Sequence, residues 1–384
     1  MNPYSYYEFF AGGGMARAAL DSDGWHCRFA NDFDHKKSAI YRRNWTSNNL
    51  LSCDIREVGV ANLPGQADLA WASFPCQDLS LAGGGAGLKG DRSGTFWPFW
   101  HLMTELASDN RAPRIIALEN VCGTLTSHGG KDFAAICSAF AKAEYRFGAM
   151  VVDASLFVPQ SRPRLFIVGI RNDCVVPTGL TQSGPSSLWH PRGLRTAFEI
   201  VSAAARAKWL WWSPPVPPPR TKVLADMVEE DPSDVPWHAP LETQRILAMM
   251  SEVNRAKVDA AKNTRRRLIG TIYKRTRFDG RGDKVQRAEV RFDDIAGCLR
   301  TPAGGSSRQL ILVVKGENVR SRLMSGREAA RLMGLPESYQ LPEKYNEAYH
   351  LAGDGVVIPV VSHLAKHIFE PIAMLSANDA RVAA

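Results

Sequence analysis

Short apolar segments alternate with helical segments from residue 4 to residue 171, and this alternation restricts the possible folds more than any other feature of the chain. Five of the apolar segments are expected to be strands, at residues 4–12, 26–33, 67–74, 114–121 and 164–171. Strands that alternate with helices form a mostly parallel, doubly wound sheet. In such sheets ligands bind beyond the carboxyl ends of the strands. We therefore predict an α/β fold with its site at that edge.

The composition of the sequence changes after Val175. The segments "PTGLTQSGPSS" and "WWSPPVPPPR" are rich in proline, glycine and serine, which are typical of loops and linkers. We expect one domain over residues 1–185, a smaller and irregular domain over 186–345, and a final helical part over 346–384. Within the second domain, "SGREAARLMGLPESY" predicts a capped helix that ends at Gly334.

Positive charge is concentrated in one stretch of a chain whose formal net charge is +8. The segment from Arg255 to Arg287 is densely basic and contains only three acidic residues. One interpretation is a solvated helical face. A stretch this unbalanced more often follows a phosphate backbone, because neutralising phosphates favours Lys and Arg. The composition therefore favours a nucleic-acid partner.

Several classes of protein are not indicated. The seven cysteines are scattered without a C-x-x-C pair, so neither a zinc site, nor any other metal site, nor a disulfide framework is expected. The first residues lack the features of a signal peptide, and no uninterrupted apolar run reaches the length of a membrane span. We expect a cytoplasmic protein without a membrane partner.

Three glycines follow the first expected strand, in "FFAGGGMARAAL". They permit a tight turn and let the backbone approach a ligand, although a plain turn without a ligand would also use them. The spacing differs from G-x-G-x-x-G, the pattern of a pyrophosphate site. Asp32 follows at the distance where an acidic residue commonly binds ribose hydroxyls, and Asp54 ends a further strand. These features suit a nucleoside cofactor without pyrophosphate, such as S-adenosylmethionine.

Cys76 lies in "SFPCQDLS" after the third expected strand. A lone cysteine is usually a small buried residue that only packs in the core. Here Pro75 marks the end of the strand, and a glycine-rich segment of the kind that closes over a substrate follows. Glu119 follows another strand, and we expect Arg162 and Arg164 on one face of a strand by alternation. Each of these three charged residues alone could be an ordinary surface group. Together with Cys76 they form a polar set at strand ends.

The motifs "FAGGG", "FPCQDLS", "LENV", "QSRPR" and "REAARLMGLPESY", in this order, resemble those of the cytosine-5 DNA methyltransferases of bacteria and phages. The resemblance spans nearly the whole chain. It implies a site for S-adenosylmethionine in which Asp32 binds the ribose and Phe33 packs on the adenine. The other residues implied for this site are Phe10, Gly12, Gly14, Asp54 and Ile55.

The resemblance also implies the reaction. Cys76 would attack carbon 6 of a cytosine flipped out of duplex DNA, and Glu119 would contact the base. Arg162 and Arg164 would form the cationic side of the base pocket, with Arg162 at the carbonyl oxygen. The final helix would fold back onto the first domain. The sequence departs from the family where it has Asp354 in place of an asparagine.

Target recognition is expected between the "QSRPR" motif and the "SGREAAR" helix. A glycine-rich loop there offers Arg300, Thr301, Gly304, Gly305 and Arg308 as DNA-binding residues. Either arginine could contact a guanine in bidentate fashion, and contacts to phosphates alone are equally open. The tryptophans of "WLWW" are expected to pack in the core or linker.

The leading hypothesis is a DNA (cytosine-5)-methyltransferase of a restriction-modification system, or an orphan or phage modification enzyme. Its expected partner is double-stranded DNA, and a monomer is expected. A cognate restriction endonuclease is a further candidate partner, one that would act on the same DNA without being physically bound. The alternatives are a transfer-RNA cytosine-5 methyltransferase and a catalytically idle DNA-binding relative. The Cys-Phe-Thr tripeptide usual in the RNA enzymes is absent, and the set of Cys76, Glu119 and Arg162 argues against an idle protein.

Overall fold

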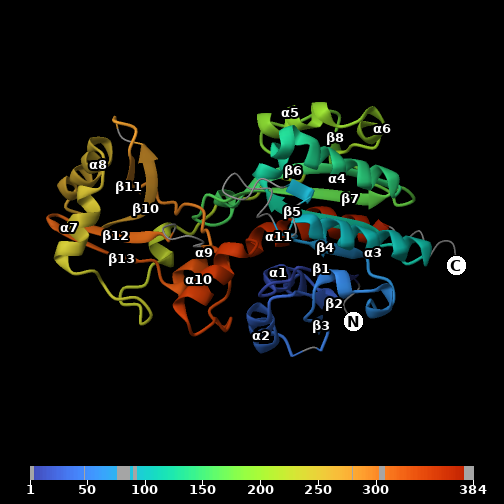
Figure 1. The fold of residues 1–384 in the computed structure, drawn as a ribbon, viewed down its shortest axis with the longest axis horizontal. Coiled ribbons are helices and arrows are strands. Elements are labelled where there is room, and N and C mark those ends of the chain that lie inside the picture. The colour runs from blue at the N-terminus through green and yellow to red at the C-terminus, as the bar shows by residue number, and fades with distance from the viewer. Residues whose placement is uncertain are drawn as a thin grey trace. The chain divides into compact units, whose positions relative to one another are not determined.

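The computed structural model describes residues 4–46, 48–75, 87–89, 93–278, 280–301 and 308–375. The chain divides into two compact units (Figure 1). The first unit comprises residues 1–153, 163–217 and 358–384, and the second comprises 154–162 and 218–357. The boundary expected after residue 185 therefore falls inside the first unit, which continues to Pro217. The second unit extends to Val357.

A seven-stranded sheet with the order β3-β2-β1-β4-β5-β7-β6 forms the centre of the first unit. Its strands are β1 (Tyr4–Phe9), β2 (Trp25–Asn31), β3 (Leu50–Leu51), β4 (Leu69–Ala72), β5 (Ile115–Val121), β6 (Tyr145–Asp153) and β7 (Pro163–Arg171). Strands β1 to β5 are mutually parallel, whereas β7 runs antiparallel to both β5 and β6. The predicted mostly parallel α/β sheet is confirmed, and β6 is a strand that the alternation did not reveal.

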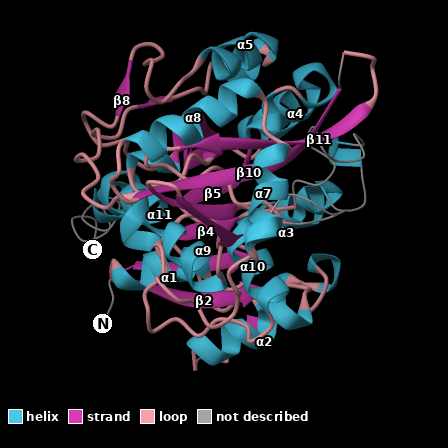
Figure 2. Ribbon diagram, turned by 90° about the vertical axis from the view of Figure 1, so that its left-hand side faces the viewer, coloured by secondary structure: helices cyan, strands magenta, loops and turns pink. Residues whose placement is uncertain are grey.

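The helices of the first unit cover both faces of this sheet (Figure 2). They are α1 (Met15–Ser22), α2 (His35–Asn44), α3 (Phe96–Ser108), α4 (Lys131–Lys142), α5 (Arg192–Ile200), α6 (Ala203–Arg206) and α11 (Ile358–Leu364). Helix α1 packs against α11, so the segment that follows Val357 belongs to the first unit.

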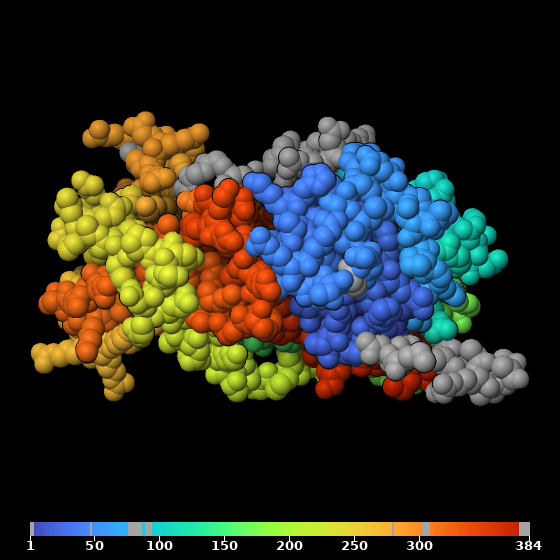
Figure 3. All heavy atoms as spheres, turned by 90° about the horizontal axis from the view of Figure 1, so that it is seen from below, coloured from blue at the N-terminus to red at the C-terminus, as the bar shows by residue number. Residues whose placement is uncertain are grey.

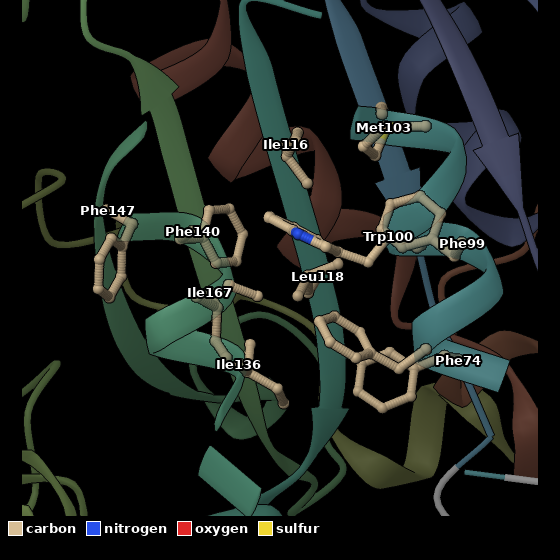
Figure 4. Close-up of a cluster of buried hydrophobic side chains, with 14 of the residues drawn as sticks. Phe74, Phe99, Trp100, Met103, Ile116, Leu118, Ile136, Phe140, Phe147 and Ile167 are labelled. Atoms are coloured by element: carbon tan, nitrogen blue, oxygen red, sulfur yellow. The ribbon is translucent and has the colours of Figure 1, made fainter. Parts of the chain in front are cut away.

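Helices cover both faces of the sheet, and successive side chains of each strand point to opposite faces, so nearly all side chains of strands such as β4 and β5 are buried. On one face, Ile116 and Leu118 of β5 lie in a cluster with Trp100 of α3 and Phe140 of α4 (Figure 4). The rings of Trp100 and Phe140 are 4.7 Å apart at their centroids. On the other face, Trp71 of β4 packs against the C-terminal segment 365–369. This double burial explains why the strand sequences are almost continuously apolar.

The region 172–217 adds a small two-stranded sheet, β8 (Thr181–Gln182) and β9 (Trp211–Trp212), to the first unit. Trp212 is fully buried, and its indole Nε1 donates a hydrogen bond of 3.0 Å to the carbonyl of Val168. Trp209 is partly buried against the core of the same unit. The tryptophans therefore pack as expected.

The helical segment Tyr345–Leu375 is long and apolar enough to cross a membrane, judged by its length and composition alone. Within the described residues it is the one segment of this kind. However, 56% of its most apolar stretch is buried inside the structure, and the core helix of a globular protein can have the same length and composition. Burial of Val360, Val361 and Leu364 in the first unit accounts for the apolar character of α11.

The second unit contains a four-stranded antiparallel sheet in the order β11-β10-β12-β13. Its strands are β10 (Leu268–Phe278), β11 (Lys284–Arg291), β12 (Leu310–Lys315) and β13 (Asn318–Leu323). Its helices are α7 (Pro240–Ala248), α8 (Glu252–Asn263), α9 (Gly326–Leu332) and α10 (Tyr345–Asp354). The capped helix predicted from the sequence is α9, whose Ser325 and Glu328 form a reciprocal capping box.

A buried polar network joins β1, α1 and α2 of the first unit. The carboxyl group of Glu8 accepts hydrogen bonds of 3.2 Å from the backbone N–H of Arg17 and from the hydroxyl of Tyr41. The guanidinium of Arg17 donates to Tyr41 at 3.0 Å and forms an ion pair of 2.9 Å with Asp21. Burial raises the pKa of Glu8 from 4.5 to about 8, although the nearby charge of Arg17 opposes this.

This pKa shift makes the stability of the protein depend on pH. Between pH 4.5 and 8 the folded state retains a proton on Glu8 that the unfolded chain has released. The contribution of Glu8 to the free energy of unfolding therefore falls as the pH rises, by up to about 1.4 kcal/mol per pH unit. We expect Glu8→Gln, which has no proton to release, to show a correspondingly shallower slope in urea unfolding at a series of pH values. Equal slopes for the two proteins would show that Glu8 is ionised in the folded state.

Candidate active site and cofactor site

The turn after β1 depends on residues with positive φ angles. Phe10, Gly12 and Gly14 have φ values of 57°, 57° and 75°. A Cβ atom on Gly14 would lie 2.5 Å from the ring of Trp45, so only glycine fits there. The N–H of Gly12 donates a hydrogen bond of 2.7 Å to the carboxylate of Asp32. Thus two of the residues predicted for the cofactor site, Gly12 and Asp32, are joined by a hydrogen bond.

Asp32 follows β2 and is 7% exposed. Its second carboxylate oxygen accepts the N–H of Asp34 at 2.8 Å. Burial raises its pKa, while the charge of Lys37 and the two main-chain donors lower it. A carboxylate oxygen can accept two hydrogen bonds, so this group can still bind hydroxyls. The adjacent Phe33 is 60% exposed, which is unusual for a large apolar ring next to a buried acid.

Asp54 and Ile55 lie at the start of a short 3-10 turn after β3. The carboxylate of Asp54 accepts the N–H of Arg56 at 2.9 Å and pairs with its guanidinium at 3.1 Å. Ile55 is buried in the core cluster. The described contacts of Asp54 therefore stabilise its own turn.

Glu119 and Arg164 form an ion pair at the edge of the sheet. Glu119 lies near the end of β5, and Arg164 lies near the start of the antiparallel neighbour β7. Arg164 Nε is 3.2 Å from Glu119 Oε1, and the two side chains are 15% and 9% exposed. The structure thus brings together two of the four residues predicted to be catalytic, in a largely buried pair.

The segment before Cys76 is held at the same edge. Asn120 Nδ2 donates a hydrogen bond of 3.0 Å to the carbonyl of Phe74, while its Oδ1 accepts the N–H of Val121 at 2.8 Å. Phe74 follows β4, and it is buried. Cys76 itself lies outside the described residues. Asn120 therefore ties the chain two residues before Cys76 to the end of β5.

Two buried asparagines were not singled out by sequence reasoning as site residues. Besides Asn120, the side chain of Asn31 donates to the carbonyls of Leu51 and Cys53, joining the ends of β2 and β3. Both residues are at most 5% exposed. Asparagine is unfavourable in strands, so its presence at the carboxyl end of an apolar strand was the available signal.

Arg162 has a different environment from the one predicted. It is 2% exposed and belongs to the second unit. Its guanidinium donates hydrogen bonds of 2.7–2.8 Å to the carbonyls of Leu299, Gly353 and Gly355. The prediction that Arg162 and Arg164 share one face of a strand is wrong, because β7 begins only at Pro163. In addition to these main-chain acceptors, the Arg162 guanidinium contacts the sulfur of Cys298 at 3.5 Å, also in the second unit.

The residues predicted to bind DNA are described in part. Arg300 is exposed, and Gly304 and Gly305 lie outside the described residues. Thr301 donates a hydrogen bond from its hydroxyl to the carboxylate of Asp354. Arg308 donates to Asn346 and stacks over the ring of Tyr345 at 5.6 Å, so its described contacts are with α10.

Comparison with known proteins agrees with this arrangement of motifs. The sequence model of the C-5 cytosine-specific DNA methylase family matches residues 4–370. The Type II methyltransferase M.HhaI of Haemophilus parahaemolyticus is 23% identical over 367 residues, which cover 94% of this chain and 93% of that protein. The Type II methyltransferase M.HpaII of Haemophilus parainfluenzae is 26% identical over 390 residues, covering 97% and 91%.

Solved structures share the fold. The DNMT2 protein of Spodoptera frugiperda has a TM-score of 0.62 at 18% identity, covering 94% of this chain and 98% of that one. The S. pombe Dnmt2 methyltransferase has a TM-score of 0.57, also at 18% identity, covering 96% and 99%. With a family match over nearly its entire length, the chain belongs to the C-5 cytosine-specific DNA methylases, and it is a DNA cytosine-5 methyltransferase whose methyl donor is S-adenosylmethionine.

Proposed function

We propose that the enzyme methylates a cytosine flipped out of a specific duplex sequence, through a covalent adduct with Cys76. The observation that carries this proposal is the Glu119–Arg164 ion pair, at the sheet edge where Asn120 also holds the carbonyl of Phe74. The chain runs from there into Pro75 and Cys76. The names of the curated relatives support a modification enzyme of the restriction-modification type.

The residues of the first turn fit the methyl donor. Asp32 keeps acceptor capacity for ribose hydroxyls beyond its two main-chain partners. Phe33 offers an exposed ring to an adenine, and Phe10, Gly12 and Gly14 shape the turn beside it. Asp54 and Ile55 would border the adenine. When bound, S-adenosylmethionine supplies an electrophilic methyl group.

The base chemistry needs a nucleophile and charge stabilisation. Carbon 5 of cytosine reacts poorly until a thiolate adds to carbon 6 and makes the ring electron-rich. Cys76 would form this bond, while Glu119 in its protonated form would donate its proton to ring N3 and accept from the exocyclic amine, and so stabilise the charge produced by the addition. After methyl transfer, the proton on carbon 5 leaves to a base such as water, and the Cys76 thiolate is expelled. Arg164 fixes the orientation of the Glu119 carboxyl group throughout.

The two arginines have separate roles in this proposal. Arg164 lies beside Glu119 and belongs to the base pocket. Arg162 acts as a positioning residue, because its donors hold Leu299 and the turn at Gly353 and Gly355. This assignment modifies the sequence-based expectation, in which both arginines lined the pocket.

Cys76→Ser should abolish methylation, because a neutral hydroxyl is a far weaker nucleophile than a thiolate. The measurement is bisulfite sequencing of DNA from cells that express each protein, with wild type expected to mark one short motif. A parallel reaction on transfer RNA separates the DNA reaction from the RNA alternative. Normal methylation by the serine variant would rule out the covalent mechanism, as would failure of DNA containing 5-fluorocytosine to trap the wild-type protein.

Phe33→Ala should raise the dissociation constant for S-adenosylmethionine by about 5- to 10-fold, through loss of the ring that packs on the adenine. Isothermal titration calorimetry measures this directly. The matched control is Phe278→Ala, which removes another exposed phenylalanine from the second unit and should leave cofactor affinity unchanged. An unchanged affinity for Phe33→Ala would remove Phe33 from the cofactor site.

Arg162→Lys should lower the free energy of unfolding by about 1–3 kcal/mol. The single ammonium group of lysine cannot reach the carbonyl of Leu299 and those of Gly353 and Gly355 at the same time. Arg164→Lys keeps the positive charge and should change stability by less than about 1 kcal/mol, yet reduce kcat about 100-fold. Chemical unfolding and single-turnover methylation measure the two effects. If Arg162→Lys were as stable as wild type but inactive, Arg162 would belong to the base pocket.

A further inference from the structure

Helix α2 of the first unit is rich in positive charge. Its ten residues include four lysines and arginines and no acidic residue. The helix lies at the lower margin of the first unit in Figure 1, and the blue part of the chain that contains it is visible from below in Figure 3. Lys36, Arg42 and Arg43 are exposed there, whereas Lys37 is half-buried. The stem of Lys37 therefore packs against its own unit.

The charge of Lys37 does not favour the helix that carries it. The N-terminus of a helix has a partial positive charge, so acidic side chains stabilise the first turn and basic ones destabilise it. The first turn of α2 has His35, Lys36 and Lys37 and no acidic residue. Lys37 is the least exposed of the three. A half-buried lysine at this position therefore calls for an explanation other than helix stability.

The main chain of Lys37 is held in register with Asp32. Asp34 is the N-cap of α2, and its carboxylate accepts the N–H of Lys36 at 2.9 Å and the N–H of Lys37 at 3.2 Å. The N–H of Asp34 in turn donates a hydrogen bond of 2.8 Å to Asp32. One capping residue thus joins the start of α2 to the acid that is proposed to bind the ribose.

The side chain of Lys37 extends over the glycine turn. Its Cδ lies 4.0 Å from the point where a Cβ on Gly12 would be. Gly12 is also the residue whose N–H donates to Asp32. Burial raises the pKa of Asp32, and the positive charge of Lys37 opposes that rise, so the ammonium group lies close enough to act on this carboxyl group. An ammonium group has three donors, and one acceptor does not exhaust them.

We propose that Lys37 binds the carboxylate in the methionine part of S-adenosylmethionine. The methionine part is joined to the ribose through the sulfonium sulfur by a short flexible chain, so a cofactor held by its ribose at Asp32 keeps this carboxylate near the same turn. The carboxylate is the one anionic group of the cofactor, and it complements the ammonium charge. This inference rests on the proposed function, in which Asp32 and the glycine turn hold the cofactor. It makes Lys37 a residue that selects ligands with an intact amino-acid part.

The test compares two thioether ligands that share the adenosine part. S-adenosylhomocysteine, the product of methyl transfer, has the carboxylate, whereas methylthioadenosine lacks the whole amino-acid part. Lys37→Met keeps an apolar stem without the charge, and it should raise the dissociation constant of S-adenosylhomocysteine about 5- to 10-fold while leaving that of methylthioadenosine unchanged. Isothermal titration calorimetry measures both. Equal losses for the two ligands would mean that Lys37 acts through Asp32 and the ribose, and unchanged affinity for S-adenosylhomocysteine would mean that it makes no contact. Either result would overturn the proposal.

Two further variants separate a direct contact from a general effect of charge. Lys36→Met removes an exposed lysine from the same helical turn and should leave both affinities unchanged. Lys37→Arg keeps the positive charge and should retain most of the affinity for S-adenosylhomocysteine. Equal losses for Lys36→Met and Lys37→Met would contradict a direct contact. None of these measurements uses DNA or methylation, and Phe33→Ala tests the cofactor site itself. Failure of the Lys37 contact is therefore distinguishable from failure of the Cys76 chemistry.

Discussion

The hydrogen-bonded register of β5 between β4 and β7 is the constraint on which the candidate active site depends. β4 and β5 run parallel, so Phe74 and Asn120 follow the sheet to the same edge, where the Asn120 side chain bonds the Phe74 carbonyl. β7 runs antiparallel, and it therefore begins at the edge where β5 ends. Val121 of β5 lies opposite Arg164 of β7, which places the guanidinium beside Glu119. If β7 were parallel to β5, Arg164 would lie at the opposite edge of the sheet.

The turn proposed to bind the cofactor depends on a buried polar network as well as on its glycines. Glu8, Arg17 and Tyr41 are buried together, and the N–H of Arg17 that Glu8 accepts belongs to the first helix after the turn. Removing Glu8 would leave the Tyr41 hydroxyl and the N–H of Arg17 buried without this acceptor, which costs more than the bond itself contributes. The network therefore fixes where α1 starts relative to β1. The positions of Gly12 and Asp32 follow from that, because their hydrogen bond spans the two strand ends.

Local patterns predicted the strands and helices that carry the motifs, since apolar alternation and glycine turns are short-range signals. They also placed Glu119 and Asp32 at strand ends. They did not predict the antiparallel direction of β7, because pairing direction is set by contacts far apart in sequence. Arg162 illustrates the same limit. The spacing of residues 160–164 gives no information about its carbonyl acceptors at Leu299 and Gly353, which lie far away in the sequence. Proline-rich composition located a linker after Val175, but the strand Trp211–Trp212 pairs back onto the first unit and moves the boundary to Pro217.

Asp354, between Gly353 and Gly355, occupies a position where the family usually has asparagine. Its surroundings show how the second unit can accommodate this difference. One described contact at this position is a hydrogen bond from the Thr301 hydroxyl, which requires an acceptor. A carboxylate supplies that acceptor as well as an amide oxygen does, and a hydrogen bond to a charged acceptor is the stronger of the two. The neighbouring Gly353 and Gly355 contribute through their carbonyls, which Arg162 binds whatever side chain lies between them. The main-chain carbonyls of this turn therefore bind Arg162, while residue 354 provides an acceptor for Thr301.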